Sequence, residues 1–228
     1  MQQLLFRNGG KRRGAGRKPG GPRAGTTHDA RPTVKPYHAL HVTLRVMPDV
    51  ASLRRPAMYK VIRAASALTA RRAAFRIVHL SIQRTHLHLI VEANDKRALA
   101  RGLQGFQISV ARQVNKLHER HGRVFADRYH LVLIKSPTQM RRVLSYVLCN
   151  WHKHGDDRSA PRGWLVDPYS TGSLFHGWKE CARGAVLWPS AKAHDWIVVR
   201  PACSWVLTTG WRLGGEVSVY DVPGQRPD

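Results

Sequence analysis

Residues 75–92 read FRIVHLSIQRTHLHLIVE, and this stretch predicts a β-hairpin. In 75–83 and again in 86–92, aliphatic side chains alternate with mostly polar ones, as they do along strands that bury one face. Arg84 and Thr85 supply the polar turn between the two runs. The aliphatic set is Val78, Leu80, Ile82, Leu87, Leu89 and Val91, and the alternating set is His79, Ser81, Gln83, His86, His88 and Ile90.

Further strands and helices are expected on both sides of this hairpin. Pro56 suits the first turn of a helix, and Ser136 followed by Pro137 is typical of a helix start. The expected elements are a strand over 38–47, a helix over 56–72, strands over 75–83 and 86–92, a helix over 95–120, a strand over 128–135 and a helix over 136–154. This order predicts an α+β protein whose sheet is ferredoxin-like, a split β-α-β-β-α-β arrangement with one additional C-terminal helix.

The two faces of the expected sheet differ in polarity. Two amphipathic helices suffice to cover the aliphatic face. The other face would then remain for a ligand, with the last helix on or beside it. That face would collect His41, Thr43, His79, Ser81, Gln83, His86, His88, Arg128 and His130.

The charge of the chain indicates a polyanionic partner. Its 228 residues carry a formal net charge of +24, which favours nucleic acid, with an acidic membrane surface as the weaker alternative. The apolar stretch 196–207 is interrupted by Arg200 and Pro201, so no membrane span is expected. No signal peptide is visible in 1–13. Three scattered cysteines (Cys149, Cys181, Cys203) form no CxxC pair, which indicates a reducing cytoplasm.

Three segments are expected along the chain. Residues 1–35 hold nine Lys and Arg against the single acid Asp29, with few apolar side chains, which predicts a disordered basic arm that binds DNA phosphates through residues such as Arg12, Arg13, Arg17 and Lys18. Residues 36–154 hold the expected sheet and helices. Residues 155–228 form a tryptophan-rich extension that either packs on the core or stacks on bases, with a small strand pair expected within 205–217.

Two short patterns carry possible chemistry. His86 and His88 share one face of a strand, whereas Tyr146 and Asn150 share one face of a helix. A histidine pair on a half-exposed strand is more often solvated than catalytic, and a helical tyrosine is more often packed than reactive. Two imidazoles and an amide oxygen can nevertheless hold a divalent cation, beside which a tyrosine is a plausible nucleophile for a phosphodiester.

The patterns together resemble a known family. HLHLIV at 86–91, FADRYH at 125–130 and YVLCN at 146–150 are similar to the single-tyrosine HUH transposases, and most of all to the REP-associated tyrosine transposases of bacteria. The resemblance covers roughly residues 36–154, in the same order, and the family fold is the same split βαβ arrangement. Thr85 departs from the pattern, because family members often have asparagine before the first histidine.

The resemblance implies a reaction and a set of roles. His86, His88 and Asn150 would bind Mg²⁺ or Mn²⁺, and Tyr146 would attack a phosphodiester to give a 5′-phosphotyrosine. The substrate would be single-stranded or hairpin DNA of the repetitive extragenic palindrome type. The protein would act in the cytoplasm at the nucleoid, as a monomer or a homodimer.

Several further residues are expected near His86, His88, Asn150 and Tyr146, and each has more than one possible role. Arg128, Arg141, Arg142 and Lys153 are candidates for phosphate contacts. His41 and His130 would contact DNA, support the metal ligands, or be ordinary polar strand residues. Tyr129, the competing nucleophile, alternates with Leu131 and is expected in the core.

Two alternatives remain at the level of sequence. One is a non-catalytic nucleic-acid-binding protein with an RRM-like sheet, although the chain lacks the aromatic segment typical of that module. The other is a domesticated transposase that binds DNA but has lost catalysis.

Overall fold

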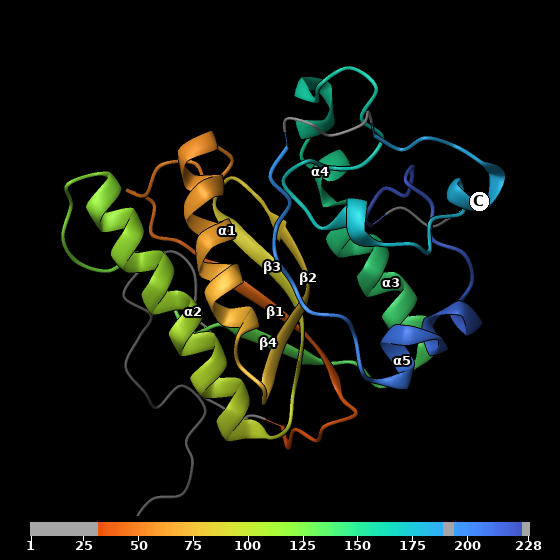
Figure 1. Ribbon diagram of the computed structural model, residues 1–228, viewed down its shortest axis with the longest axis horizontal. Helices are drawn as coiled ribbons and strands as arrows, with labels where there is room; N and C mark the ends of the chain where they lie inside the picture. The colour runs from red at the N-terminus through yellow and green to blue at the C-terminus, as the bar shows by residue number, and fades with distance from the viewer. Residues whose placement is uncertain (1–31, 189–193, 225–228) are drawn as a thin grey trace, which may run out of the picture.

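The computed structural model describes residues 32–188 and 194–224, and a four-stranded antiparallel sheet organises them (Figure 1). The predicted basic arm lies outside the described residues, except for 32–35. The sheet has the strand order β2-β3-β1-β4, which confirms the α+β, split βαβ prediction. Its elements are β1 Ala39–Arg45, α1 Pro56–Ala70, β2 Phe75–Ile82, β3 His86–Ala93, α2 Lys96–Leu117 and β4 His130–Leu133.

The helix boundaries follow from local capping. Pro56 begins α1, and the Asp95 side chain accepts a hydrogen bond of 2.7 Å from the backbone N–H of Ala98 at the start of α2. An uncapped backbone N–H at a helix start is costly, which explains why the helix starts here. At its other end, α2 stops at Leu117, three residues before the predicted Arg120.

Strand β4 is shorter than the predicted 128–135, and the pairing explains why. His130 lies opposite Thr43, and Phe125 forms a bridge with Val46. Four residues of one chain segment therefore face two residues of β1, so a continuous ladder cannot form between the two contacts. Arg128 consequently precedes the strand and does not lie in it.

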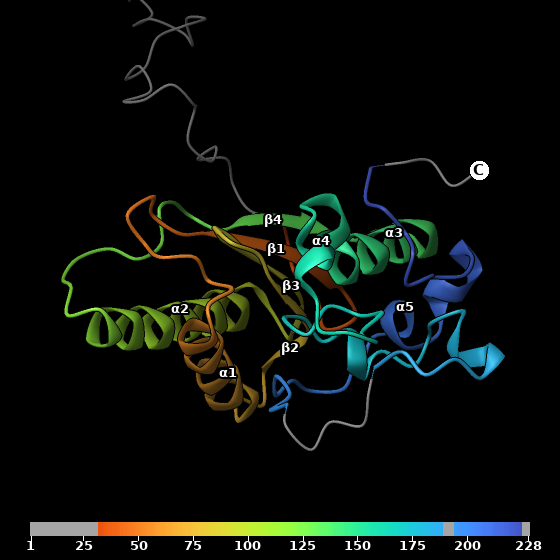
Figure 2. The ribbon, with the colours of Figure 1, turned by 90° about the horizontal axis from the view of Figure 1, so that it is seen from above.

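Helices α1 and α2 cover one face of the sheet (Figure 2). The first core lies between them, with Leu40, Val42, Leu87, Leu89 and Phe106 completely buried. Tyr129 packs against this core, as expected. The alternation along β1 and β3 thus directs one complete set of aliphatic side chains away from the polar set.

The opposite face is covered. The prediction that the last helix lies on or beside this face is confirmed, whereas the expectation that the face remains for a ligand is wrong over most of its area. Helix α3, Pro137–Leu148, and residues of the extension pack over it (Figure 1). A β-bulge between Ile77 and His79 turns Val78 to this side, where it joins Ile90 in a second core. The polar residues there are buried too: His79, Ser81, Gln83 and His88.

The helix predicted over 136–154 is broken in two. Helix α3 ends at Leu148, and the one-turn helix α4, Asn150–Lys153, begins after Cys149. The predicted start is confirmed, since the Ser136 hydroxyl accepts a hydrogen bond from the backbone N–H of Gln139. Cys149 has φ −106° and ψ 10° and lies buried, with its thiol 3.4 Å from the carbonyl oxygen of Ser218. Asn150 therefore begins a separate helical turn and does not continue α3.

The extension packs onto both cores. Trp178 and Trp211 are buried, whereas Trp205 is 58% exposed. The buried carboxylate of Glu92 accepts hydrogen bonds of 2.9 and 2.7 Å from the backbone N–H groups of Cys203 and Ser204. These contacts favour packing as the main role of the tryptophans.

The strand pair predicted within 205–217 is wrong. This segment contains the short helix α5, Trp205–Thr208, and the 3₁₀ helix η4, Gly210–Gly214, which packs against α3. Among the described residues, no helix is long and apolar enough to cross a bilayer.

A close approach of α2 to β2 makes one glycine essential. A Cβ at Gly102 would overlap the ring of Phe75, which is buried, whereas a Cβ at Gly105 would meet only the mobile end of Arg72. Gly102→Ala should therefore lower the unfolding free energy by about 1–3 kcal/mol. Gly105→Ala, the matched control, should leave it unchanged or raise it by up to about 1 kcal/mol. Urea denaturation measures both, and equal effects would contradict the packing.

The buried His79 should make stability depend on pH. Burial lowers its pKa from 6.5 to about 4. Between these values the unfolded chain binds a proton that the folded chain does not, so the unfolding free energy falls as the pH falls. The contribution is at most about 1.4 kcal/mol per pH unit. In His79→Gln, the slope of unfolding free energy against pH between about 6.5 and 4 should be shallower than in the wild type. An unchanged slope would show that His79 titrates normally.

Candidate active site

Two histidines of β3 face each other on the side of the sheet that α3 covers. His86 and His88 are the first and third residues of the strand, so their side chains share a face. Their Nε2 atoms lie 3.0 Å apart. Two metal–nitrogen bonds of roughly 2.1 Å at a right angle would separate their nitrogens by roughly the same distance. The pair is therefore spaced as two ligands of one cation.

Both imidazoles are neutral at neutral pH. Burial lowers the pKa of His86 to about 4, assisted by the positive charges of His154 and Arg45. Burial also lowers the pKa of His88 to about 2, assisted by its histidine neighbours. A metal ligand must be the unprotonated imidazole, so neither ring has to lose a proton before it can bind.

Residues of β1 orient His88 from behind. The Nδ1 atom of His88 lies 3.2 Å from Nε2 of His41 and 3.3 Å from Oγ1 of Thr43. The register that pairs Thr43 with His88 fixes these contacts. Partners of this kind set the tautomer and the ring direction of a metal-binding histidine. His41 is thus placed to support His88, one of the alternatives open at the level of sequence.

Tyr146 lies over the histidines from the side of α3. Its ring centroid is 5.0 Å from that of His88 and 5.7 Å from that of His41. The ring is half-buried, burial raises the pKa of the phenol, and no described residue hydrogen-bonds its hydroxyl. The Nζ atom of Lys153 is 5.7 Å from the ring centroid. The tyrosine and the histidine pair therefore meet within one chain.

Asn150 is the first residue of α4 and is 1% exposed, yet neither atom of its amide has a hydrogen-bond partner among the described residues. Such a buried amide costs about 1–3 kcal/mol and calls for an explanation such as an ion. The turn that Asn150 begins lies against the histidines, since the ring of His154 is 5.9 Å from that of His86.

Two imidazoles and an amide oxygen could together hold a divalent cation. Because imidazole is a softer ligand than Mg²⁺ prefers, Mn²⁺ would fit this donor set at least as well. Within the described ranges no cluster of three or more His, Cys, Asp and Glu side chains could hold a metal. This finding is compatible with the donor set, because its third member is an asparagine. The orphaned amide is the observation that favours a fit.

A cavity of about 900 Å³ opens beside Tyr146. His41, Gln139 and Arg142 line it from the sheet and α3, and residues 214–216 and 222–224 line it from the extension. Arg142 is exposed, whereas Arg141 holds the extension through Asp221 at 3.0 Å and the carbonyl oxygen of Glu216.

The other predicted DNA-binding residues lie around this region or outside the described part. His130 is exposed on β4, close enough to His41 for its charge to lower the pKa of that residue. Arg128 is exposed just before β4, and Lys153 is exposed on α4. Arg12, Arg13, Arg17 and Lys18 lie outside the described residues.

Sequence reasoning missed two members of the site. Thr43 was placed only on the polar face, and His154 only at a helix end. The alternation of β1 indicated the face of Thr43, but its contact with His88 depends on the strand register. The ring of His154 lies 5.9 Å from that of His86, after the break between α3 and α4 at Cys149, and no Gly or Pro marks that break.

Comparisons with known proteins extend the family resemblance to the fold. No protein-family model matches the chain, and no curated protein does. Among solved structures, that of a REP-associated tyrosine transposase bound to a REP hairpin matches with a TM-score of 0.51 and 18% identity, covering 78% of this chain and 100% of that one. At this identity the match shows the fold, which the two proteins share.

A crystal structure of a candidate transposase from Deinococcus radiodurans R1 also matches, with a TM-score of 0.35 and 12% identity, over 59% of this chain and 100% of that one. So low a score carries no argument. The resemblance seen in the sequence is thus confirmed for the fold.

Replacing Asn150 should raise the stability of the metal-free protein and at the same time remove its metal binding. In Asn150→Leu, removal of a buried amide without partners should raise the unfolding free energy of the metal-free protein by about 1–3 kcal/mol. The same change should abolish Mn²⁺ binding measured by calorimetry, because an oxygen ligand is lost. Thr43→Val should weaken Mn²⁺ binding by roughly 10-fold or more, as for other residues that orient a ligand. Unchanged Mn²⁺ affinity in Asn150→Leu would exclude it as a ligand.

Proposed function

We propose that this protein is a metal-dependent DNA strand transferase that nicks and rejoins single-stranded or hairpin DNA through a 5′-phosphotyrosine. The observation that carries the proposal is the position of Tyr146, whose ring lies 5.0 Å from His88 while Nε2 of His88 faces Nε2 of His86. A phenol beside two convergent neutral imidazoles is the arrangement that a tyrosine nucleophile and a cation require.

The shared fold supports this class of reaction. The neighbour of the same fold is a REP-associated tyrosine transposase bound to a REP hairpin. We propose palindromic DNA of that kind as the substrate, which would place the protein at the nucleoid of a bacterial cell. His86, His88 and Asn150 would hold Mg²⁺ or Mn²⁺, and Tyr146 would be the nucleophile.

The reaction follows from the groups present. A bound Mg²⁺ or Mn²⁺ would polarise the scissile phosphoryl group and offset its negative charge. The Tyr146 hydroxyl loses its proton, and its oxygen forms a bond to phosphorus as the bond from phosphorus to the 3′-oxygen breaks. The 5′-phosphate stays on the tyrosine, and the 3′-oxygen leaves as a hydroxyl after taking up a proton. Attack by a different 3′-hydroxyl reverses these steps and rejoins the DNA without ATP.

The cation-rich surroundings of Tyr146 favour a negatively charged strand. Burial opposes ionisation of the phenol, so positive charge must assist it, and Lys153 is the described cation that lies near the ring. Arg142 lines the adjoining cavity. Burial lowers the pKa of His41 to about 4, so this neutral ring offers hydrogen bonds and not charge; His130 is exposed on the neighbouring strand β4. Arg128 and the arm residues Arg12, Arg13, Arg17 and Lys18 would add contacts to phosphates further along the DNA.

The recessed position of the site favours unpaired DNA. His88 is only 2% exposed, and Tyr146 is half-buried between the sheet and α3. A single strand can bend to bring one phosphate into such a site, whereas a continuous duplex is wide and stiff. A hairpin with an unpaired flank offers both a folded stem and a reachable phosphate.

The alternative of an RRM-like binding protein loses support. That mode of binding needs an accessible sheet face with stacking aromatics. Here α3 and the extension bury His79, Ser81 and Gln83 on the corresponding face. A domesticated protein that binds without cleaving keeps the same surfaces, and the experiment below distinguishes it.

The covalent intermediate provides the test. The full-length protein is incubated with Mn²⁺ and a pool of hairpin oligonucleotides with randomised unpaired flanks, labelled at either the 3′ or the 5′ end. The wild type should form an SDS-resistant, protease-sensitive adduct that retains the 3′ label, and chelation by EDTA should prevent it. Tyr146→Phe should form none. Tyr129→Phe is the matched control and should form it normally, because Tyr129 packs against the first core.

Two results would contradict the proposal. An adduct of undiminished yield in Tyr146→Phe would assign the nucleophile elsewhere, and retention of the 5′ label would reverse the polarity of the reaction. Binding of the same hairpins by the wild type without any adduct would favour the domesticated protein.

A further inference from the structure

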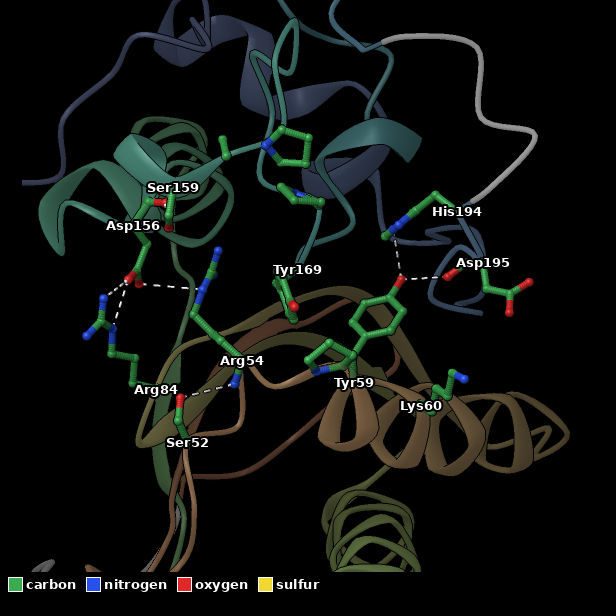
Figure 3. A pocket seen from close by; sticks show the side chains of 14 residues that line it. Ser52, Arg54, Tyr59, Lys60, Arg84, Asp156, Ser159, Tyr169, His194 and Asp195 are labelled. Carbon is green, nitrogen blue, oxygen red and sulfur yellow. Dashed lines mark hydrogen bonds and ion pairs between the residues drawn. The ribbon is translucent and has the colours of Figure 1, made fainter.

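A second cavity of about 620 Å³ lies at the turn between β2 and β3, next to the candidate active site (Figure 3). Its lining comes from α1 and the segment before it, from this turn, from the 3₁₀ helix η1, Asp156–Ser159, and from the extension. Arg84 in its wall is two residues before His86, and Asp156 is two residues after His154. An ion pair of 2.7 Å joins Arg84 to Asp156, so the cavity wall and the candidate active site are neighbours along both chain segments.

Aromatic rings form part of the cavity wall, and hydrogen bonds hold them in place. The ring of Tyr59 is 5.4 Å from that of Tyr169 and 5.3 Å from that of His194. The Tyr59 hydroxyl donates a hydrogen bond of 2.6 Å to the carbonyl oxygen of Asp195 and lies 3.1 Å from Nε2 of His194. Figure 3 shows Tyr169 between Arg54 and Tyr59. Tyr169 and His194 are partly exposed, so they are the rings that a ligand can reach.

Charged side chains in the same wall differ in their partners and in their exposure. Arg54 forms two hydrogen bonds of 2.8 Å with Asp167 and lies 4.5 Å from the centroid of Tyr169. Asp156 is 3% exposed, and its carboxylate lies between two guanidinium groups: Oδ2 is 3.6 Å from Nε of Arg54, and Oδ1 is 2.7 Å from a terminal nitrogen of Arg84. The side chains of Arg84 and Lys60 are exposed at the rim. The cavity therefore has aromatic rings in its wall and cationic side chains at its rim.

We propose that this cavity holds one unpaired nucleobase of the DNA substrate, an inference that rests on the proposed strand transfer. The volume lies within the range of small-molecule sites. The partly exposed rings of Tyr169 and His194 give the base aromatic surface to pack against, although Arg54 covers one face of Tyr169. Arg84 and Lys60, exposed at the rim, would meet the adjoining phosphates. The base would belong to the unpaired flank that runs from the scissile phosphate at Tyr146 over the β2–β3 turn.

Photo-crosslinking tests the position of the base. Hairpins whose unpaired flank carries one 5-iododeoxyuridine at successive positions are irradiated with the full-length protein, and the crosslinked peptides are identified by mass spectrometry. One flank position should crosslink to Tyr169 or His194. Tyr169→Leu should reduce that crosslink and weaken flank binding by about 10-fold, whereas Tyr169→Phe, which keeps the ring, should preserve both. Thermal unfolding of each variant reports whether it is folded.

The outcomes separate this inference from the proposed function. If the wild type forms the tyrosine adduct but no flank position crosslinks to Tyr169 or His194, the base site is overturned and strand transfer stands. If the crosslink appears without an adduct, the base site stands and strand transfer fails. Tyr146→Phe should keep the crosslink. If free 5-iododeoxyuridine monophosphate crosslinks to these residues while every oligonucleotide fails, the cavity is not a DNA site.

Discussion

The antiparallel register between β1 and β3 is the constraint on which the candidate site depends. It sets Thr43 opposite His88 and brings His41 within 3.2 Å of the same ring. A shift by one residue would move the histidines of β3 to the aliphatic face and expose Leu87 and Leu89. The buried first core therefore stabilises the register, and the register in turn orients His88, a proposed metal ligand. Apolar packing on one face of the sheet therefore determines where the histidine side chains lie on the other face.

The second core places Tyr146, the proposed nucleophile. Helix α3 lies on the sheet through its own apolar side and is held from behind by η4 and by the bonds of Arg141 to Asp221 and Glu216. Tyr146 is thereby directed at His88, and the bend at Cys149 returns the chain toward the histidine pair. The extension serves as a rigid support for this helix, and it also contributes walls to the two cavities beside the site.

The sequence predicted the parts of the structure that local patterns determine. Alternation and helical periodicity gave the order of the elements and the aliphatic face, and the motifs around His86 and Tyr146 indicated the family fold. The last helix was expected on or beside the polar face, but the burial of most of that face was missed. That burial depends on the β-bulge that turns Val78, on Ile90 and on distant residues such as Trp178. The bend at Cys149 was missed because no Gly or Pro marks it. The contacts of Thr43 and His154 were missed because each needs a partner from another element, which periodicity does not identify.

The central claim is that a tyrosine and a metal-binding histidine pair of one chain form one active site. Complementation between two inactive variants tests it most directly. Tyr146→Phe supplies intact histidines and His88→Ala supplies an intact tyrosine, and the two are mixed in equal amounts with Mn²⁺ and a hairpin that the wild type converts to an adduct. Because Tyr146 lies beside the histidines of its own chain, the mixture should form no adduct. Recovery of the adduct would contradict the account, since it would show that the tyrosine of one chain serves the histidines of another.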